Sequence, residues 1–475
     1  MGMLVDVLSA TVIVYFVVLN LLYLGFTLLA WRELVRYRHS RESSPVDEVF
    51  RSPLTSPVSI LLPAFNEEAG VVDSVESLLH LRYPEFEVIV IDDGSTDGTL
   101  AALREAFDLV PVRKALQTEI QTAPIRQTLF SRKHHNLWVV SKDNGGKADA
   151  LNSGLNASRY PYICAVDGDA VLEQDALIRV MMPIVDNQTV VATGGIIRIA
   201  NGCQIDRGRV TEVGLPKSRL ATLQVVEYLR AFLVGRVGWS ALGGLLIISG
   251  AFGVFKRSVV MEAGGYSVGT VGEDMELVVR LHRHLREKAK PYRIAFVPDP
   301  VCWTEVPEDL TTLGRQRRRW QRGLAETLWR HRSAIGRPGM GSLGWLAMPY
   351  FVLFELLGPL VESAGYLVIP IAAALGVLSA EYLLAFLVLS IVWGTLLSIS
   401  ALALEEISFR RHPRSRHIAR LALYALVDNL GYRQLSNLWR LRGLVDFLRG
   451  KQGWGVMHRK GLNRSRDGVP RQEAA

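Results

Sequence analysis

Asp167 and Asp169 are the residues whose types and spacing most clearly suggest chemistry in this chain. They flank Gly168 directly after the apolar run Tyr162–Val166. Two carboxylates at positions i and i+2 around a glycine converge on one point, and hard divalent cations prefer such oxygen ligands, leaving positions open for phosphate oxygens. The alternative is that each Asp only forms a turn or caps a helix. The spacing favours a metal site.

Lys147 lies in a segment suited to binding phosphate. It follows the glycine turn Asp143–Gly146 and opens a helical segment, and a helix N-terminus beside a Lys attracts phosphate. The segment is not a P-loop, because Ser141 stands in place of the required first glycine and no Ser or Thr follows Lys147. Metal and phosphate are therefore indicated without the signature of a kinase or an ATPase.

Two further clusters lie later in the chain. Glu273 and Asp274 open an apparent helix after a glycine-rich loop, where helix capping by acidic residues is the alternative. Gln316, Arg319 and Trp320 lie on a basic helix. The alternative is that this helix lies beside a membrane and does no more than contact lipid headgroups.

These residues need a scaffold that brings them to one edge. Between residues 52 and 335, short β-branched runs alternate with segments of helical period, which predicts an α/β fold with a mainly parallel sheet. Ligands bind beyond the carboxyl ends of the strands in such sheets. The predicted strands are Val58–Leu62, Val88–Ile91, Leu137–Val140, Tyr162–Val166 and Val190–Thr193. The predicted helices are Val71–Leu79, Thr99–Phe107, Ala148–Asn156 and Gln174–Met182.

The composition of the 475 residues points to a membrane-embedded part, since 49% are hydrophobic and only 21% are charged, against about 25% in soluble domains. Three cysteines without a CxxC pair argue against a disulfide framework and a cysteine-ligated zinc site. His282 and His284 lack the helical spacing of zinc ligands, and we expect them to be solvated. The net charge of +8 suits an anionic partner; because the arginines cluster beside apolar segments, lipid is favoured over nucleic acid.

The expected membrane segments flank the α/β part. Val7–Ala30 carries no charge and is long enough to span a bilayer, so residues 1–31 are expected to be an uncleaved N-terminal anchor. Residues 343–404 are expected to form a helical hairpin of Leu356–Leu378 and Tyr382–Leu404, joined by a tight turn. Arginines follow both regions, and the positive-inside rule then places residues 52–335 in the cytoplasm of a multi-pass protein of the cell membrane. These arginines are Arg32, Arg36, Arg38 and Arg41, then Arg410, Arg411, Arg414, Arg416 and Arg420.

Residues 405–475 are expected to form basic interfacial helices and a tail. Ile418–Leu430 is apolar but short and contains Asp428, which favours an interfacial or re-entrant helix, although a span stays open. In Gly431–Arg449, leucines recur at helical spacing among arginines. That pattern predicts a helix on the anionic inner leaflet, and a solvated tail is the alternative.

Glu355 and Glu362 are carboxylates in an otherwise apolar segment, seven residues apart and therefore expected on one helix face. An ionisable residue inside a membrane usually faces a polar cavity or a partner. We expect the two glutamates to line an exit path, with Tyr366 adding an aromatic surface. The alternative is that Glu362 is protonated or hydrogen-bonded to a neighbouring helix.

Five motifs in one order carry a resemblance to a known family. The chain resembles the membrane-integrated family-2 inverting glycosyltransferases with a Rossmann-like GT-A fold, which include cellulose, chitin, hyaluronan and poly-N-acetylglucosamine synthases. The resemblance covers residues 52–335 and, in layout, the flanking anchors. The motifs are Val58–Glu67, Asp92–Ser95, Asp167–Asp169, Glu273–Asp274 and Gln316–Trp320.

The resemblance implies a donor site and a metal. Asp92 and Asp93 would bind the uracil of a UDP-sugar, and Lys147 would lie near its diphosphate. Asp169 and Asp167 would hold Mn²⁺ or Mg²⁺ on that diphosphate, where the metal stabilises the leaving group.

The resemblance also implies a catalytic pair and an acceptor site. Glu273 and Asp274 form the pair, with Asp274 as the general base that deprotonates the acceptor hydroxyl. The implied acceptor residues are Gln316, Arg319, Trp320, Ser249 and Gly250. Many members have Thr where this chain has Gly272, so the local acceptor contacts differ here.

The implied activity is extension of a β-linked polysaccharide from a UDP-sugar, with UDP-N-acetylglucosamine as the first candidate, in a processive reaction coupled to export. The growing glycan would then be the acceptor. The alternative is a non-processive enzyme that adds one sugar to a lipid, and a non-enzymatic sensor of nucleotide sugar is a third reading. Three expected spans are few for a lone channel, so a homo-oligomer or an export partner is expected as well as contact with membrane lipids.

Overall fold

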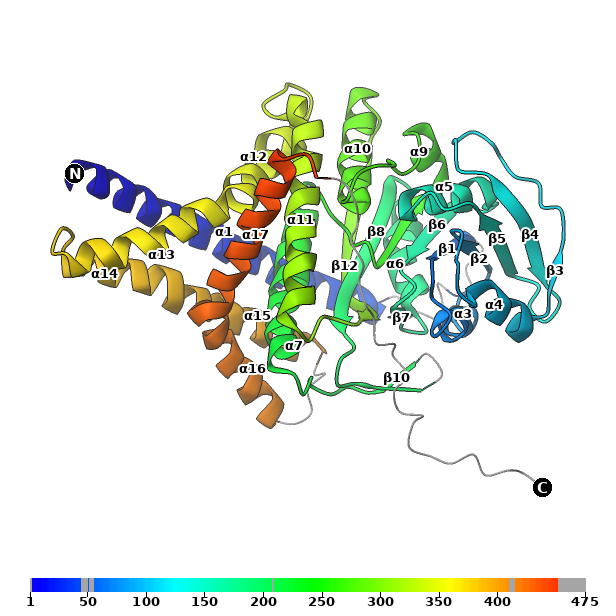
Figure 1. The fold of residues 1–475 in the computed structure, drawn as a ribbon, viewed down its shortest axis with the longest axis horizontal. Helices are drawn as coiled ribbons and strands as arrows, with labels where there is room; N and C mark the ends of the chain where they lie inside the picture. Colours follow the sequence, from blue (N-terminus) through cyan, green and yellow to red (C-terminus); the bar gives the residue numbers. More distant parts are fainter. Residues whose placement is uncertain (1, 44–49, 51–54, 207–208, 410–414, 452–475) are drawn as a thin grey trace.

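The computed structural model describes residues 2–43, 50, 55–206, 209–409 and 415–451. Arg410, Arg411, Arg414 and the tail at 452–475, which figure in the sequence expectations, lie outside these residues. Long helices form one end of the molecule and a large sheet with its covering helices forms the other (Figure 1).

The described residues contain a ten-stranded mixed sheet. The strands in the order β5-β2-β1-β6 are parallel and form its centre. Strand β11 then runs antiparallel between β6 and β8. In sheet order the strands are β3 (Leu109–Pro111), β4 (Ile125–Ser131), β5 (Leu137–Lys142), β2 (Phe86–Asp92), β1 (Val58–Ala64), β6 (Tyr162–Val166), β11 (Phe252–Lys256), β8 (Val190–Ile199), β12 (Arg293–Thr304) and β7 (Ala170–Leu172).

All five predicted strands are present, but the prediction of a mainly parallel sheet holds only for the centre. The flanks are mixed: β4 pairs antiparallel with β5 across a short connection and β11 runs antiparallel beside β6, whereas β8 and β12 are again parallel. The sequence pattern missed β12, which contains Pro298 and Pro300 and shifts register at Pro300. Proline removes a ladder donor and argues against a central strand, so the apolar run was not recognised.

Helices cover the sheet and shape the site. Two predicted helices have the expected bounds, α3 (Val71–Leu79) and α4 (Thr99–Phe107). The other two are α5 (Lys147–Ala157) and α6 (Ala176–Asp186), each displaced by one to four residues at its ends. The remaining helices near the site are α7 (Arg219–Tyr228), the π-helical η1 (Leu229–Arg236), α8 (Val237–Ala241), α9 (Arg257–Glu262), α10 (Glu273–Glu287) and α11 (Leu310–Arg330).

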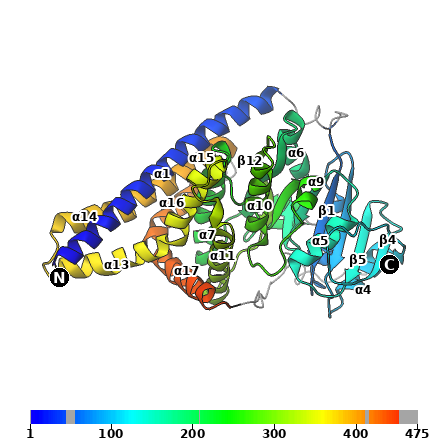
Figure 2. The ribbon, with the colours of Figure 1, turned by 90° about the horizontal axis from the view of Figure 1, so that it is seen from above.

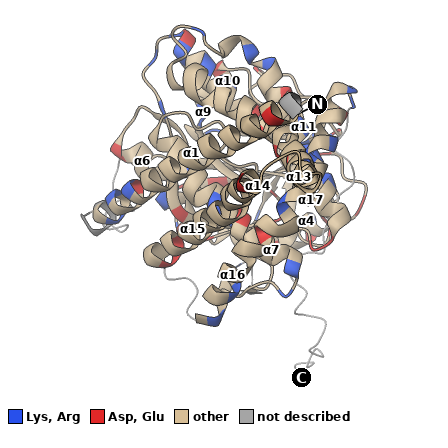
Figure 3. Cartoon of the chain, turned by 90° about the vertical axis from the view of Figure 1, so that its left-hand side faces the viewer, with Lys and Arg blue, Asp and Glu red and all other residues tan. Residues whose placement is uncertain are grey.

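Three helices in the described residues are long and apolar enough to cross a membrane, namely Val5–His39, Leu343–Ala374 and Ala380–Phe409. They match the expected anchor and hairpin, with the hairpin turn between Ala374 and Ala380. Figure 3 views the end where they gather: α13, α14 and α15 are mostly uncharged, and basic residues lie on surrounding elements such as α10, α11 and α16. The segments are α1 (Gly2–Ser43), η3 (Leu343–Ala347), α12 (Met348–Tyr350), η4 (Phe351–Leu356), α13 (Gly358–Ala374), α14 (Ala380–Leu387), η5 (Val388–Val392) and α15 (Trp393–Phe409).

One hydrophobic core joins the sheet to these apolar helices. Helix α1 runs past α15 toward the sheet (Figure 2). Phe26, Ala30 and Leu34 of α1 are buried in the same cluster as Ile60 and Val88 of the central strands. The α/β part therefore shares its interior with the first apolar helix, so the two are not separate packing units.

The C-terminal helix α17 packs against the protein through a face that includes arginines. Helix α17 (Arg433–Leu448) lies along α11, and a Cβ added at Gly443 would meet the Arg318 carbonyl oxygen at 2.5 Å. The expectation that the arginines of α17 face lipid headgroups is wrong for Arg433 and Arg440, which pair with Glu362 and Glu355.

The leucines of α17 differ in exposure: Leu435, Leu441 and Leu444 are partly buried. Leu438 and Leu448 are exposed, 52% and 74%. The preceding α16 (Ser415–Val427) buries Leu421 and Ala425 against α7 and α15. A π-helical turn with a kink at Leu430 then leads into α17.

Candidate active site

A cavity of about 640 Å³ collects most of the residues that the sequence singled out. Its walls come from the end of β6, the loop before β11, the start of α10, the middle of α11, η1 and η4. The predicted site residues that line it are Lys147, Asp167, Asp169, Ser249, Gly250, Glu273, Asp274, Gln316, Arg319, Trp320 and Glu355. The predicted residues that do not line it are Asp92, Asp93, Glu362 and Tyr366.

Lys147 is a cation in the wall of this cavity. Its Nζ atom lies 2.7 Å from Asp167 Oδ1 and 3.0 Å from Glu273 Oε1, and it donates to the Gly250 carbonyl at 3.4 Å. Burial disfavours the charge of Lys147, but Asp167 and Glu273 outweigh it and raise the pKa of the ammonium. The amine is therefore held charged at neutral pH, as binding of a phosphate requires.

Asp274 is well placed to accept a proton inside the cavity. It lies in the first turn of α10, and its Oδ1 atom accepts the Met275 N–H at 2.8 Å. Its Oδ2 atom faces Gly250, where an added Cβ would lie 3.2 Å away. For the neighbouring Glu273, burial and then the charge of Asp274 raise the pKa against the effect of Lys147.

The loop before α10 has a structural reason for its glycine. A Cβ added to Gly272 would lie 3.3 Å from the Gly323 Cα atom of α11, and one added to Gly323 would lie 3.0 Å from the Gly272 nitrogen. The two backbones therefore touch directly. A Thr at position 272 would press against α11, so this departure from the family pattern fits a closer contact between the loop before Asp274 and the helix that carries Trp320.

Asp167 and Asp169 offer the donor atoms that a divalent cation needs. Both carboxylates line the cavity directly after β6. Within the part of the chain that the structure describes, no group of three or more His, Cys, Asp or Glu side chains could enclose a metal. Two carboxylates fit a hard cation whose other ligands are phosphate oxygens and water, so this pair suits a metal that arrives with a nucleotide.

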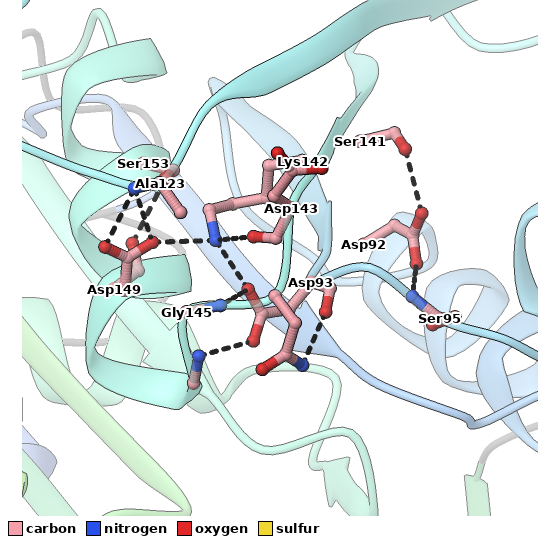
Figure 4. Close-up of polar contacts among 12 residues, drawn as sticks. Asp92, Asp93, Ser95, Ala123, Ser141, Lys142, Asp143, Gly145, Asp149 and Ser153 are labelled. Atoms are coloured by element: carbon pink, nitrogen blue, oxygen red, sulfur yellow. Dashed lines mark hydrogen bonds and ion pairs between the residues drawn. The ribbon is translucent and has the colours of Figure 1, made fainter.

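Asp92 and Asp93 lie beside the cavity and hold the turns there. Asp92 accepts hydrogen bonds from the Ser95 N–H at 3.1 Å and from the Ser141 hydroxyl at 3.0 Å. Asp93 accepts the Gly146 N–H at 2.8 Å and pairs with Lys142, an arrangement drawn in Figure 4. Both are 3% exposed, and their contact with uracil stays a prediction.

Helix α11 presents Trp320 to the cavity, with 44% of its surface exposed. Sequence reasoning missed Arg317, whose guanidinium lies 4.3 Å from the centre of the Trp320 ring and pairs with Glu227 at 2.6 Å. It also missed Arg236, which lines the cavity and donates to the Ile248 carbonyl at 2.8 Å. Burial lowers the pKa of Arg236 to about 10, and Asp274 opposes the shift.

The three channel candidates separate in the fold. Glu355 reaches the cavity and is held by Arg440 at 3.0 Å. Glu362 instead accepts two hydrogen bonds from Arg433 and one from Asn437. This agrees with the alternative expectation that Glu362 is hydrogen-bonded to a neighbouring helix. The helix is π-helical over 351–356 and α-helical from residue 358, and the wider turn changes the phase between the two glutamates.

Tyr366 packs beside Phe16 and Phe386 and does not line the cavity. An exit path through Glu362 and Tyr366 stays a prediction.

Two family models match the sequence. One, glycosyl transferase family 2, matches residues 59–226. The other, glycosyl transferase family group 2, matches residues 162–401, about half of the chain. Together they cover the sheet, the cavity and most of the two apolar helices that follow it, Leu343–Ala374 and Ala380–Phe409.

Curated relatives include poly-beta-1,6-N-acetyl-D-glucosamine synthases of two staphylococci. The Staphylococcus epidermidis protein is 30% identical over 275 residues, covering 58% of this chain and 56% of the relative. The protein of Staphylococcus aureus strain COL is 29% identical over 277 residues, with the same coverage. The chain spans about half the length of the curated relatives it matches.

Among solved structures, a mannosyltransferase from Pyrobaculum calidifontis, in complex with GDP-Man and Mn²⁺, superimposes with a TM-score of 0.52. It is 21% identical, and the match covers 89% of this chain and 99% of that chain. At this identity, the similarity shows a common fold.

Proposed function

Because the chain belongs to glycosyl transferase family group 2, we propose that it is a membrane-bound inverting glycosyltransferase that extends a β-linked polysaccharide from a UDP-sugar. One observation carries this proposal. A single cavity brings together a carboxylate pair for a metal, a charged lysine, a carboxylate base and an exposed indole from four separate segments. Those are the groups that transfer from a nucleotide sugar to a hydroxyl requires.

The residues have distinct tasks in the proposed reaction. Lys147 binds the diphosphate, and Arg319 offsets the charge that develops on it. Asp274 takes the proton from the acceptor hydroxyl as that hydroxyl attacks the anomeric carbon. Trp320 stacks on the acceptor sugar, and Gln316 borders the same space. Asp92 and Asp93 would contact the uracil of the donor.

Asp167 and Asp169 would hold the divalent cation, Mn²⁺ or Mg²⁺. When bound, the metal would supply Lewis-acid stabilisation of the departing diphosphate. The Mn²⁺ present with GDP-Man in the mannosyltransferase of the same fold supports this assignment.

The names of the relatives support UDP-N-acetylglucosamine as the donor and the growing glycan as the acceptor. The three apolar helices and the arginines that follow them support a multi-pass protein of the cell membrane with a cytoplasmic site. Glu355 lies in the second apolar helix and also lines the cavity, which supports a product that leaves toward the membrane. A homo-oligomer or an export partner would complete such a path.

A second candidate is transfer of a single sugar to a lipid. It is favoured by the small number of apolar spans in the described residues, since a lipid acceptor needs no channel of its own.

Incubation of the purified protein with a panel of UDP-sugars and Mn²⁺ tests both candidates. We expect UDP release with UDP-N-acetylglucosamine and a product that grows with time. A product that stays at one added sugar on a lipid would establish the second candidate. No UDP release from any donor would refute glycosyl transfer from UDP-sugars.

A further inference from the structure

We propose that Lys142 is a positioning residue that fixes the nucleotide-binding turn and so sets where Lys147 points. This inference rests on the proposed function, because it concerns how the donor site is held. Lys142 ends β5 and does not line the cavity. It acts through residues that do.

Lys142 is a fully buried cation between two carboxylates. Its side chain is 0% exposed, and its Nζ atom lies 2.6 Å from Asp93 Oδ1 and 2.7 Å from Asp149 Oδ1. It also donates to the Asp143 carbonyl at 2.5 Å. Figure 4 shows the ammonium at the meeting point of β5, the end of β2 and helix α5. An isolated buried charge is costly, and pairing with hydrogen bonds offsets that cost.

The two carboxylates hold the backbone of the turn that precedes Lys147. Asp93 accepts the Gly145 N–H at 3.0 Å and the Gly146 N–H at 2.8 Å. From the other side, Asp149 accepts the Ala123 N–H at 3.1 and 3.2 Å. One ammonium therefore fixes the turn, the first turn of α5 and the segment before β4.

The turn at Gly145 and Gly146 packs closely against Asp149. A Cβ added to Gly145 would lie 2.5 Å from the Asp149 Cγ atom, and Gly146 has a φ of +85°. Glycine is therefore required at 145 by close approach and at 146 by the left-handed backbone. Any shift of Asp93 or Asp149 would move this turn directly.

Lys147 is the next residue, so the turn decides where its side chain starts. Its Nζ atom must sit between Asp167 and Glu273, at 2.7 and 3.0 Å. At metal sites, removing the outer partners that orient the ligands typically costs about 10–100-fold in affinity or activity. We expect a loss of that size in nucleotide affinity when Lys142 no longer anchors the turn.

The variants separate positioning from stability. Lys142→Met leaves two buried carboxylates without their cation and is expected to lower stability as well as affinity. Lys142→Met combined with Asp149→Asn removes one positive and one negative charge, so the cluster keeps the net charge of the native protein. Lys114→Met is the matched control, because Lys114 pairs at 3.3 Å with another buried carboxylate, Glu87 of β2, with side chains 9% and 0% exposed.

The experiment measures UDP binding in the presence of Mn²⁺ and thermal unfolding, with the full chain in detergent. We expect the charge-matched double variant to unfold near the native temperature and to bind UDP about 10–100-fold more weakly. Lys114→Met is expected to keep the native affinity. Native affinity in both Lys142 variants would overturn the proposal, as would an equal loss in Lys114→Met.

A double-mutant cycle then asks whether Lys142 acts through Lys147. In a Lys147→Met background, the Lys142 substitution should cost little further affinity, because the side chain it positions is gone. Equal losses in both backgrounds would contradict positioning of Lys147. If the native protein itself binds no UDP, the proposed donor fails instead, so the two failures are distinguishable.

Discussion

Asp274 is the residue at which chemistry and binding should separate. We expect Asp274→Asn to lower kcat about 10²–10⁴-fold, because an amide has the size of the carboxylate and cannot take a proton. UDP affinity should change little. Measured rates of UDP release and UDP dissociation constants would check both parts.

A surface carboxylate on the same helix provides the control. Glu287 ends α10 with its side chain 40% exposed, and Glu287→Gln should keep native turnover. Native turnover in Asp274→Asn would remove Asp274 from the role of base.

Asp169 should control the metal dependence of nucleotide binding. Asp169→Asn removes one anionic ligand from a hard-cation site, so the gain in UDP affinity on adding Mn²⁺ should shrink. Titration of UDP with and without Mn²⁺ measures that gain. An unchanged gain would leave Asp169 with the role of a helix or turn former.

His282 gives the protein a pH-dependent contribution to stability. The expectation that it is solvated is wrong: it is 1% exposed, with Nε2 2.9 Å from the Leu245 carbonyl and Nδ1 2.6 Å from the Tyr292 hydroxyl. Burial lowers its pKa to about 4, against about 6.5 in an unfolded chain. The neutral form is favoured in the fold, so this contribution is present above pH 6.5 and is lost as the pH falls toward 4.

We therefore expect thermal stability to fall between pH 6.5 and 4, by up to about 3 kcal/mol from this group. His282→Gln should unfold at a lower temperature at pH 7.5 and lose part of the pH dependence. His135→Asn, at an exposed position, is the control. An unchanged pH dependence in His282→Gln would show that other groups cause it.

At the level of single residues, sequence reasoning found the side chains that end strands and start helices, because a carboxylate after an apolar run is a visible signal. It missed Lys142 and Arg236. Each lies in or beside an apolar segment, and a single sequence does not show which carboxylate or carbonyl will meet it in the fold. The spacing of His282 excluded a zinc site but carried no information on burial.

Among the helices, the contact of α13 with α17 contains a buried ion pair. Glu362 accepts Arg433 Nη2 at 2.7 Å and Nε at 2.9 Å and is 5% exposed. Glu362→Leu leaves Arg433 without its partner, and breaking a buried pair typically costs about 3–5 kcal/mol. We expect a clear drop in unfolding temperature and reduced activity in the same proportion.

The double variant Glu362→Leu with Arg433→Leu should recover most of the stability, because replacing both partners by apolar groups is often neutral. Thermal unfolding of the single and double variants measures the coupling. If Glu362→Leu is fully stable, releases UDP at the native rate and makes a shortened product, the exit-path role would be favoured over the structural one.

The sequence predicted these helices from their apolar length, but not the face that α17 turns inward. A basic amphipathic pattern is compatible with lipid headgroups or with protein carboxylates. Only the fold shows that Arg433 and Arg440 meet glutamates while Leu438 and Leu448 stay exposed. The phase change at the π-helical turn 351–356 was equally hidden, because the pattern assumes 3.6 residues per turn.

In the whole molecule, the α/β part depends on the first apolar helix for its stability. Phe26 and Leu34 of α1 are 4% and 3% exposed in the hydrophobic cluster that also contains the core of the sheet, and burying one such side chain contributes about 1.5–3 kcal/mol. Losing both removes a large share of the ~5–15 kcal/mol that stabilises a typical domain. We expect residues 52–335 expressed alone to aggregate or to be rapidly degraded by protease.

Co-expression with a segment covering residues 1–43 should restore protease resistance if α1 supplies the missing surface. Limited proteolysis of the fragment with and without that segment makes the comparison. A fragment that is monomeric and protease-resistant without α1 would contradict the dependence.

Helix α1 also fixes the distance between the two ends of the molecule. Phe16 packs among α13 and α14 at one end, and at the other the Tyr37 hydroxyl donates to Asp299 of β12 at 2.5 Å. An uninterrupted helix rises 1.5 Å per residue, so these anchors are about 30 Å apart. In the proposed membrane protein, this length would hold the sheet at a fixed distance from the ends of α13 and α14, and a thinner or thicker bilayer would have to deform around the protein.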